Sequence, residues 1–133
     1  IWNKNNVPMS NGIGIQGDAS SSQSALTIPA PGKLNIYFLF VVGAPSSDNQ
    51  GFWYYTIDMT KNDGLGDVVS GPIDLTKGLN LSWTEKVTAV RAKECNTFWV
   101  ISLIGDSFFS YKVNNNGVDF NNPVIGRFRC SHS

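Results

Sequence analysis

Residues 36–42 read Ile-Tyr-Phe-Leu-Phe-Val-Val, and residues 98–104 read Phe-Trp-Val-Ile-Ser-Leu-Ile. Both runs are rich in β-branched and aromatic residues, which favour β-strands. Both are also apolar at nearly every position, so each strand is expected to be covered on both faces of its sheet. The fold therefore depends on what packs against these two strands.

Five further strands are predicted around these two, because short runs of Val, Ile, Phe, Tyr, Trp and Thr alternate with turn residues. Turn signals such as Asn62-Asp63-Gly64 and Asn116-Gly117 separate the runs, and no window keeps the apolar spacing of a helix. The sequence thus predicts an all-β chain. Its strands are expected over residues 25–29, 35–42, 52–59, 67–75, 86–92, 97–104 and 107–113.

The strands form two similar series, over residues 20–80 and 83–128. Tyr37 and Trp99 are expected to take equivalent places in the two series, and Trp99 is assigned to the core. Two four-stranded antiparallel units of the β-propeller type explain this order. One seven-stranded β-sandwich explains it as well. In either case the 133 residues are expected to form a single all-β domain or a fragment of one.

The composition excludes several classes of partner. Ten basic residues balance ten acidic ones, so no net field attracts nucleic acid. No apolar run approaches the ~18 residues that a spanning helix needs, so membrane insertion is not expected. The sequence begins at Ile1, so we expect a processed chain or a piece excised from a longer one.

Few residues are suited to catalysis. The single histidine, His132, lies two positions from Cys130 near the end of the sequence, where it is poorly placed to act as a base. Cys95 and Cys130 can pair or stay as thiols, and the spacing does not decide between these. A small extracellular carbohydrate-active hydrolase is the alternative function, with a carboxylate pair drawn from Asp58, Asp67, Glu85 and Glu94.

The loop between Asp58 and Asp67 offers oxygen ligands of the kind that Ca²⁺ prefers. Its weak candidates are Asp58, Asn62, Asp63 and Asp67. Lys61 would oppose a cation, and a simple hairpin turn is the preferred interpretation of Asn62-Asp63-Gly64. We therefore expect no cofactor, with Ca²⁺ as the one weakly supported metal.

Trp53, Tyr55 and Trp83 are the candidate ligand-binding residues. Exposed Trp and Tyr rings near Asn and Asp can stack on sugars or bind protein surfaces. Trp53 and Tyr55 share a strand face beside Gly51, and Trp83 lies in a polar stretch. Packing inside the protein or at a sheet edge is the other interpretation of all three.

Long ordered motifs lie at residues 2–17, with Val7-Pro8-Met9-Ser10-Asn11-Gly12, and at residues 54–68 and 85–113. Together they resemble the N-terminal propeller-like region of large Bacteroidetes surface and secreted proteins, of the gliding-motility and type IX secretion-associated kind. The resemblance covers residues 2–126. It implies a WD40-like propeller segment at a secreted or outer cell-surface location, with a noncatalytic scaffold or binding role.

Proteins of that family continue for further blades, whereas this sequence holds two units. An incomplete ring has open sheet edges, so self-association through these edges, or a partner that completes the sheet, is expected. The expected function is that of a noncatalytic secreted or cell-surface β module, which serves a structural role or binds a protein or glycan.

Overall fold

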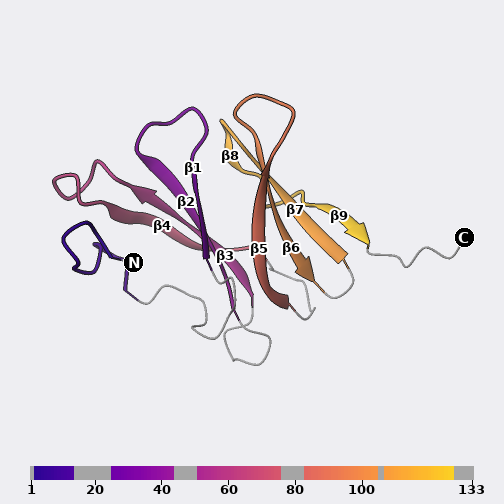
Figure 1. Ribbon diagram of the computed structural model, residues 1–133, viewed down its shortest axis with the longest axis horizontal. Coiled ribbons are helices and arrows are strands. Elements are labelled where there is room, and N and C mark those ends of the chain that lie inside the picture. Colours follow the sequence, from indigo (N-terminus) through magenta and orange to yellow (C-terminus); the bar gives the residue numbers. More distant parts are fainter. Residues whose placement is uncertain (1, 14–24, 44–50, 76–82, 105–106, 128–133) are drawn as a thin grey trace, which may run out of the picture.

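Two antiparallel β-sheets stand side by side in the computed structural model, which describes residues 2–13, 25–43, 51–75, 83–104 and 107–127 (Figure 1). Nine strands and no helix occur in these ranges. In the same ranges, nothing forms a helix with the length and hydropathy needed to cross a membrane. The all-β prediction is confirmed.

The first sheet is a four-stranded meander of β1 (Ala25–Pro29), β2 (Ile36–Val42), β3 (Phe52–Asp58) and β4 (Asp67–Asp74). Each strand pairs with its sequence neighbour, because the connecting turns are rich in Gly, Asn and Pro. The β3–β4 ladder shifts register around Thr56, so β4 carries an irregularity. Gly71 lies within β4 with a φ of 115°.

The second sheet contains β5 (Trp83–Arg91), β6 (Phe98–Ile104), β7 (Ser107–Asn114), β8 (Gly117–Val118) and β9 (Val124–Arg127). Both β8 and β9 pair with β7, which makes this sheet five-stranded. The prediction of two four-stranded units is therefore wrong in strand number here, and so is the seven-strand alternative. β8 and β9 escaped prediction because they are short and follow Asn-rich turns.

The first hairpins of the two sheets close in the same way. The Ala30 amide donates to the Ile36 carbonyl at 2.8 Å, and the Ala92 amide donates to the Thr97 carbonyl at 2.9 Å. The residue before each acceptor is an asparagine with positive φ, 66° in one hairpin and 53° in the other. Ile36 therefore corresponds to Thr97 in the second sheet.

The third strands also end in the same way. Oδ1 of Asp58 accepts a hydrogen bond from the Thr60 amide at 2.9 Å, and Oδ1 of Asn114 accepts one from the Asn116 amide at 2.9 Å. These are matching Asx turns, in which a side chain bonds the backbone two residues later. Asp58 therefore corresponds to Asn114.

This correspondence corrects the predicted alignment by one residue. Since Ile36 matches Thr97, Tyr37 matches Phe98 and not Trp99. Side chains alternate between the faces of a strand, so a one-residue shift reverses every assignment of a side chain to a face. Trp99 thus lies on the opposite face from the one that the alignment with Tyr37 predicted.

Each sheet has an A face and a B face, defined by corresponding residues. The A face of the first sheet carries Phe38, Phe40, Val42, Phe52 and Tyr54, and that of the second carries Trp99, Ile101, Leu103, Phe108 and Ser110. The B face of the first sheet carries Leu39, Val41, Trp53, Tyr55 and Ile57, and that of the second carries Val100, Ser102, Phe109, Tyr111 and Val113.

The main core lies between the sheets, where the A face of the first packs on the B face of the second. Phe40, Phe52 and Tyr54 form a cluster of rings, and Tyr111 meets Phe52 edge-on at 5.8 Å between ring centroids. Packed aromatic pairs of this kind stabilise a core beyond their buried area. The two sheets are therefore stacked head to tail, with unlike faces in contact.

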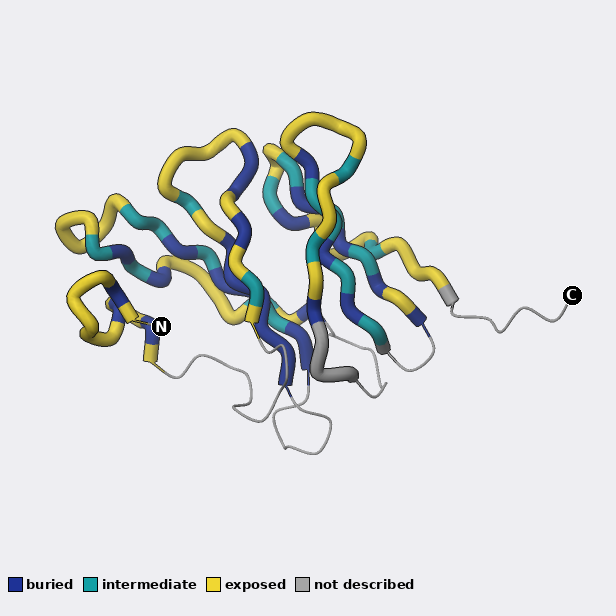
Figure 2. The backbone as a smooth tube through the Cα atoms, viewed as in Figure 1, coloured by how far each residue is buried: buried dark blue, intermediate teal, exposed yellow. Residues whose placement is uncertain are grey.

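A second, smaller core covers the B face of the first sheet. Met9, from the N-terminal segment, is buried there with side chains of β2, β3 and β4. β2 is thus buried on both faces, as predicted, and Figure 2 shows most of it in dark blue. β6 differs, because Trp99 and Ile101 are only half-buried. The assignment of Trp99 to the core is wrong.

Candidate functional site

An open cleft of about 700 Å³ lies between the two sheets, where the end of β4 faces β7, β9 and the segment before β9. Its lining combines apolar side chains with one carboxylate and one amide. The lining residues are Pro72, Ile73, Asp74, Leu75, Phe109, Tyr111, Phe120, Asn121, Pro123 and Ile125.

Tyr111 forms the floor of this cleft. Its side chain is fully buried, and its hydroxyl donates to the Leu75 carbonyl at 2.8 Å. The bond joins β7 of the second sheet to the residue that follows β4 of the first. A buried hydroxyl without a partner would destabilise the fold, so this bond stabilises the packing of the two sheets.

The charge state of the floor is set by burial and by one neighbour. Burial, and after it the negative charge of Asp74, raise the pKa of Tyr111 to about 12. The phenol is therefore protonated at neutral pH and keeps its role as a donor to Leu75.

The rim of the cleft carries its exposed side chains. Phe120 is 42% exposed and Ile125 is 55% exposed, and Asn121 lies beside them. Asn122 donates to Asp119 at 3.3 Å, which links the two sides of the turn that presents Phe120. An exposed aromatic ring, an aliphatic side chain and an amide can together hold an apolar group and one polar group of a ligand.

A smaller hollow of about 300 Å³ lies beside β4, between the N-terminal segment and the irregular part of that strand. Its lining includes Asn11, Ile13, Tyr55 and Gly71. Gly71 is needed here, because a Cβ at this position would approach Tyr55 Cδ1 to 2.7 Å and the Tyr54 carbonyl oxygen to 2.9 Å. β4 therefore passes close over Tyr55 beside this hollow.

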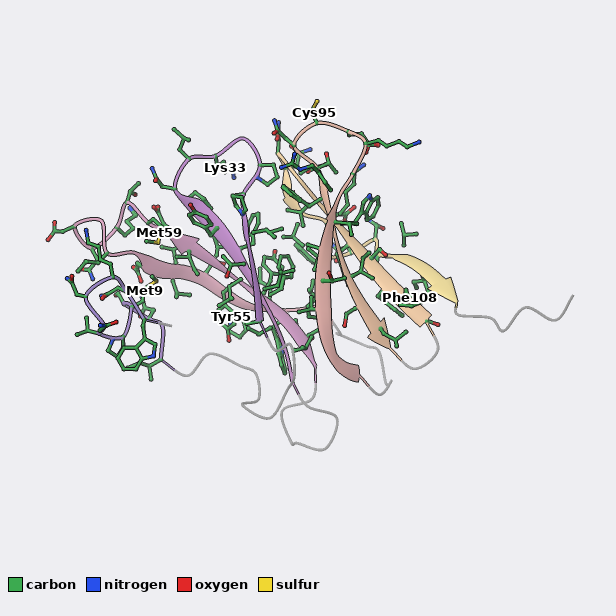
Figure 3. All side chains as sticks on the ribbon, viewed as in Figure 1. Met9, Lys33, Tyr55, Met59, Cys95 and Phe108 are labelled. Atoms are coloured by element: carbon green, nitrogen blue, oxygen red, sulfur yellow. The ribbon has the colours of Figure 1, made fainter. Side chains whose placement is uncertain are left out.

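The predicted aromatic residues do not form a common exposed platform. Tyr55 is buried on the B face, and Trp53 on the same face is half-buried (Figure 3 labels Tyr55). The Trp53 ring lies over Gly51, where a Cβ would approach its Cζ2 to 2.7 Å. Packing is thus the observed role of both side chains. Trp83 begins β5, and its side chain lies outside the described residues.

The predicted calcium loop is a tight turn. Asn62 and Asp63 have φ values of 54° and 55°, and the Leu65 amide donates to the Asn62 carbonyl at 3.0 Å. Asp58 and Asp67 sit opposite one another in the β3–β4 ladder. Across the described ranges, no group of three or more His, Cys, Asp or Glu side chains is arranged to hold a metal ion.

Of the four carboxylates predicted as candidates for a hydrolytic pair, the structure brings Asp58 and Asp67 together. Hydrogen bonds from the Thr60 hydroxyl and amide, helped by the charge of Lys61, lower the pKa of Asp58. Asp67 accepts a hydrogen bond from Asn11 at 2.8 Å. A glycosidase acid needs a raised pKa, so Asp58 is unsuited to that role.

The remaining candidates are dispersed. Glu94 is exposed in the turn after β5, and the side chain of Glu85 lies outside the described residues. Cys95 is exposed in the same turn as Glu94 and carries no disulfide, whereas Cys130 and His132 lie outside the described residues. The structure therefore places no carboxylate pair and no cysteine pair in the cleft.

The rim residues Phe120, Asn121 and Ile125 were missed by the sequence reasoning. A usable signal existed, since Phe120 is an aromatic residue in a polar stretch, as Trp83 is. The cleft itself could not be predicted, because it depends on how two sheets far apart in the sequence approach each other.

The chain was compared with protein families, with curated proteins and with solved structures. None of the three comparisons gives a match.

Proposed function

We propose that this chain is a noncatalytic recognition module of a secreted or cell-surface protein, and that its ligand binds in the cleft between the sheets. The observation that carries the proposal is the cleft of about 700 Å³, lined mainly by apolar side chains and rimmed by exposed Phe120 and Ile125. Concave apolar sites with a few polar groups are the usual form of ligand sites in proteins.

A protein segment is the ligand class that suits this lining best. Phe120 and Ile125 offer surface for an apolar side chain of a partner, and Asn121 can donate to and accept from a peptide backbone. A glycan would use several exposed aromatic faces with polar partners around them, whereas the cleft presents one exposed ring, with one carboxylate and one amide in its lining. Protein binding is therefore preferred over glycan binding.

A noncatalytic role is supported by the charge states of the candidate groups. The lowered pKa of Asp58 makes it a poor general acid, and the raised pKa of Tyr111 keeps that phenol neutral. The head-to-tail stacking of the sheets supports a propeller-type arrangement. The surface location is supported by the sequence resemblance to Bacteroidetes surface proteins.

Selecting peptides that bind the full chain from a displayed library tests whether the ligand is a protein segment. We expect selected peptides to carry an apolar side chain, and their affinity to fall about tenfold or more in the Phe120→Asp variant. Leu34→Asp is the matched control, because Leu34 is also exposed and apolar but lies in the β1–β2 turn. Equal loss in both variants would contradict a site in the cleft.

A glycan array and an oligosaccharide digestion are run on the same preparations. Glycan binding without peptide binding would reassign the ligand class and overturn the preference for protein. Loss of oligosaccharide that disappears in the Asp58→Asn variant would overturn the noncatalytic role and support the carboxylate hydrolase.

A further inference from the structure

The A face of the second sheet is apolar and partly open to solvent. Val90 of β5 is 47% exposed, Phe108 is 40% exposed, and Val124 of β9 is 57% exposed. The ladders place Val90 beside Trp99, and Val124 beside Ser110, on this same face. A neighbouring set of exposed apolar side chains of this kind marks a surface for association.

The residues of this face match the face that is already used inside the molecule. Trp99 and Phe108 correspond to Phe38 and Phe52, which lie in the core between the sheets. The fold thus contains one A face that is packed and a second that has the same aromatic pattern. In the first sheet, the A face packs against a B face.

The molecule also contains a second B face, on the first sheet. Its aromatic residues Trp53 and Tyr55 correspond to Phe109 and Tyr111, which receive the packed A face in the second sheet. Both B faces are thus apolar, with aromatic side chains at the same two positions. The B face of the first sheet could therefore receive an A face if nothing else covered it.

The N-terminal segment, residues 2–13, covers part of that B face. Met9 is buried there against side chains of the first sheet, and Figure 3 shows it close to Met59. The Val68 amide donates to the Ser10 carbonyl at 3.0 Å, and Asn11 Nδ2 donates to Asp67 at 2.8 Å. Met9 is the one apolar side chain of residues 2–13 that is buried, so the cover depends on a single apolar anchor.

We propose that residues 2–13 are an autoinhibitory cap, which prevents the B face of the first sheet from binding the A face of the second sheet of another copy of this chain. Release of the cap repeats between molecules the packing that exists within each molecule. The contact is between faces, unlike the association through open sheet edges that the sequence led us to expect. It goes beyond the proposed ligand site, because the cleft takes no part in it.

The geometry determines the kind of assembly. An A face on a B face is a head-to-tail contact, and such contacts form chains or closed rings, not symmetric dimers. Lys112 lies 5.9 Å from the Trp99 ring centroid on the A face. Its charge weakens the contact in both forms, and the capped chain, whose B face is covered by Met9, is expected to stay monomeric at micromolar concentration.

The test uses the full chain with substitutions in the cap. In Met9→Asp/Asn11→Ala, the apolar anchor and the bond to Asp67 are both lost. We expect this variant to self-associate at a concentration about tenfold or more below that of the parent chain, with masses above a dimer. Light scattering after size-exclusion chromatography measures the masses, and far-UV circular dichroism checks the fold.

Asn11→Ala alone serves if the double variant does not fold, since Met9 stays in place. It is expected to shift association in the same direction by a smaller factor. Folded cap variants that remain monomeric over the whole concentration range would overturn the proposal. So would a parent chain that already forms dimers of the same stability as the variants.

Blocking the A face identifies the partner surface. Adding Ile101→Glu to the double variant should restore the monomer, whereas Leu34→Glu, on an exposed apolar residue outside both faces, should not. Mixing the blocked double variant with the parent chain should give a one-to-one complex, because one offers a B face and the other an A face. Association that ignores Ile101→Glu would overturn the proposal.

Discussion

The central strands of the first sheet, β2 and β3, are buried on both faces, whereas β6 and β7 of the second are buried on one. Yet the hairpins of the two sheets close with the same hydrogen bonds, and their third strands end in the same Asx turn. The strands β2 and β6 are both apolar at nearly every position. The two sheets differ in the segment that reaches the B face of the first, where Met9 is buried. Cover from outside a sheet, and not only strand composition, thus decides how far its strands are buried.

The largest expected effect comes from truncating corresponding side chains on the two A faces. Phe40 is fully buried, so Phe40→Ala should lower the free energy of unfolding by about 4 kcal/mol through lost burial and a cavity. Ile101 is half-buried, so Ile101→Ala should lower it by about 1 kcal/mol. Urea titration followed by Trp fluorescence measures both. Equal losses would mean that both A faces are equally covered.

A glycine in each sheet gives the next contrast. Gly71→Ala should lower the free energy of unfolding by about 3 kcal/mol, because φ is 115° and the new Cβ would crowd Tyr55 and the Tyr54 carbonyl. Gly117→Ala, at a φ of 98° with nothing within 4 Å, should lower it by only about 1 kcal/mol. Thermal unfolding of the two variants is the measurement, and a larger effect at Gly117 would contradict the close passage of β4.

Alkaline pH should weaken the contact between the sheets. The pKa of Tyr111 is about 12, above its ordinary value of 10.0, so its stabilisation is complete below pH 10 and is lost as the pH rises toward 12. The expected loss is about 2 kcal/mol, measured by urea titration at several pH values. Tyr111→Phe should flatten this dependence. In that variant the free energy of unfolding should still fall somewhat at alkaline pH, because burial also raises the pKa of Tyr54.

The smallest effect tests whether the hairpins correspond. Asn35 and Asn96 both adopt positive φ in the first turn of their sheets. Asn tolerates this conformation better than Ala does, so each Asn→Ala change should lower the free energy of unfolding by about 1 kcal/mol, and each Asn→Gly change by less. Thermal melts of the four single variants check this. Clearly unequal losses at the two positions would argue against the correspondence.

Much of the fold could be predicted because turn chemistry marks where strands end. The strand predicted at residues 25–29 agrees at both ends with β1, since Ala30 to Asn35 form a turn rich in Pro, Gly and Asn. β9 was missed, because Val124 and Ile125 pair with β7 through a long-range contact that no local pattern signals. Trp99 was misplaced, because an alignment wrong by one residue reverses the face of a strand.

The candidate site was less predictable than the fold. Tyr55 was expected near a ligand on the basis of its strand position, yet Met9, distant in sequence, buries it on the B face. Phe120 and Ile125 line the same cleft only because β9 returns to β7 and both approach the end of β4. Residue type alone could indicate the aromatic residues as candidates for ligand binding. Whether each side chain is exposed depends on tertiary packing.

The hydrogen bond from Tyr111 to Leu75 has a consequence for any molecule that enters between the sheets. It links the two sheets at the base of the opening, so it favours the same spacing of the walls with and without a guest molecule. A guest that fits would then lose little affinity to rearrangement of the protein. Loosening this link should increase the rate at which a guest departs while leaving the surface that it touches unchanged.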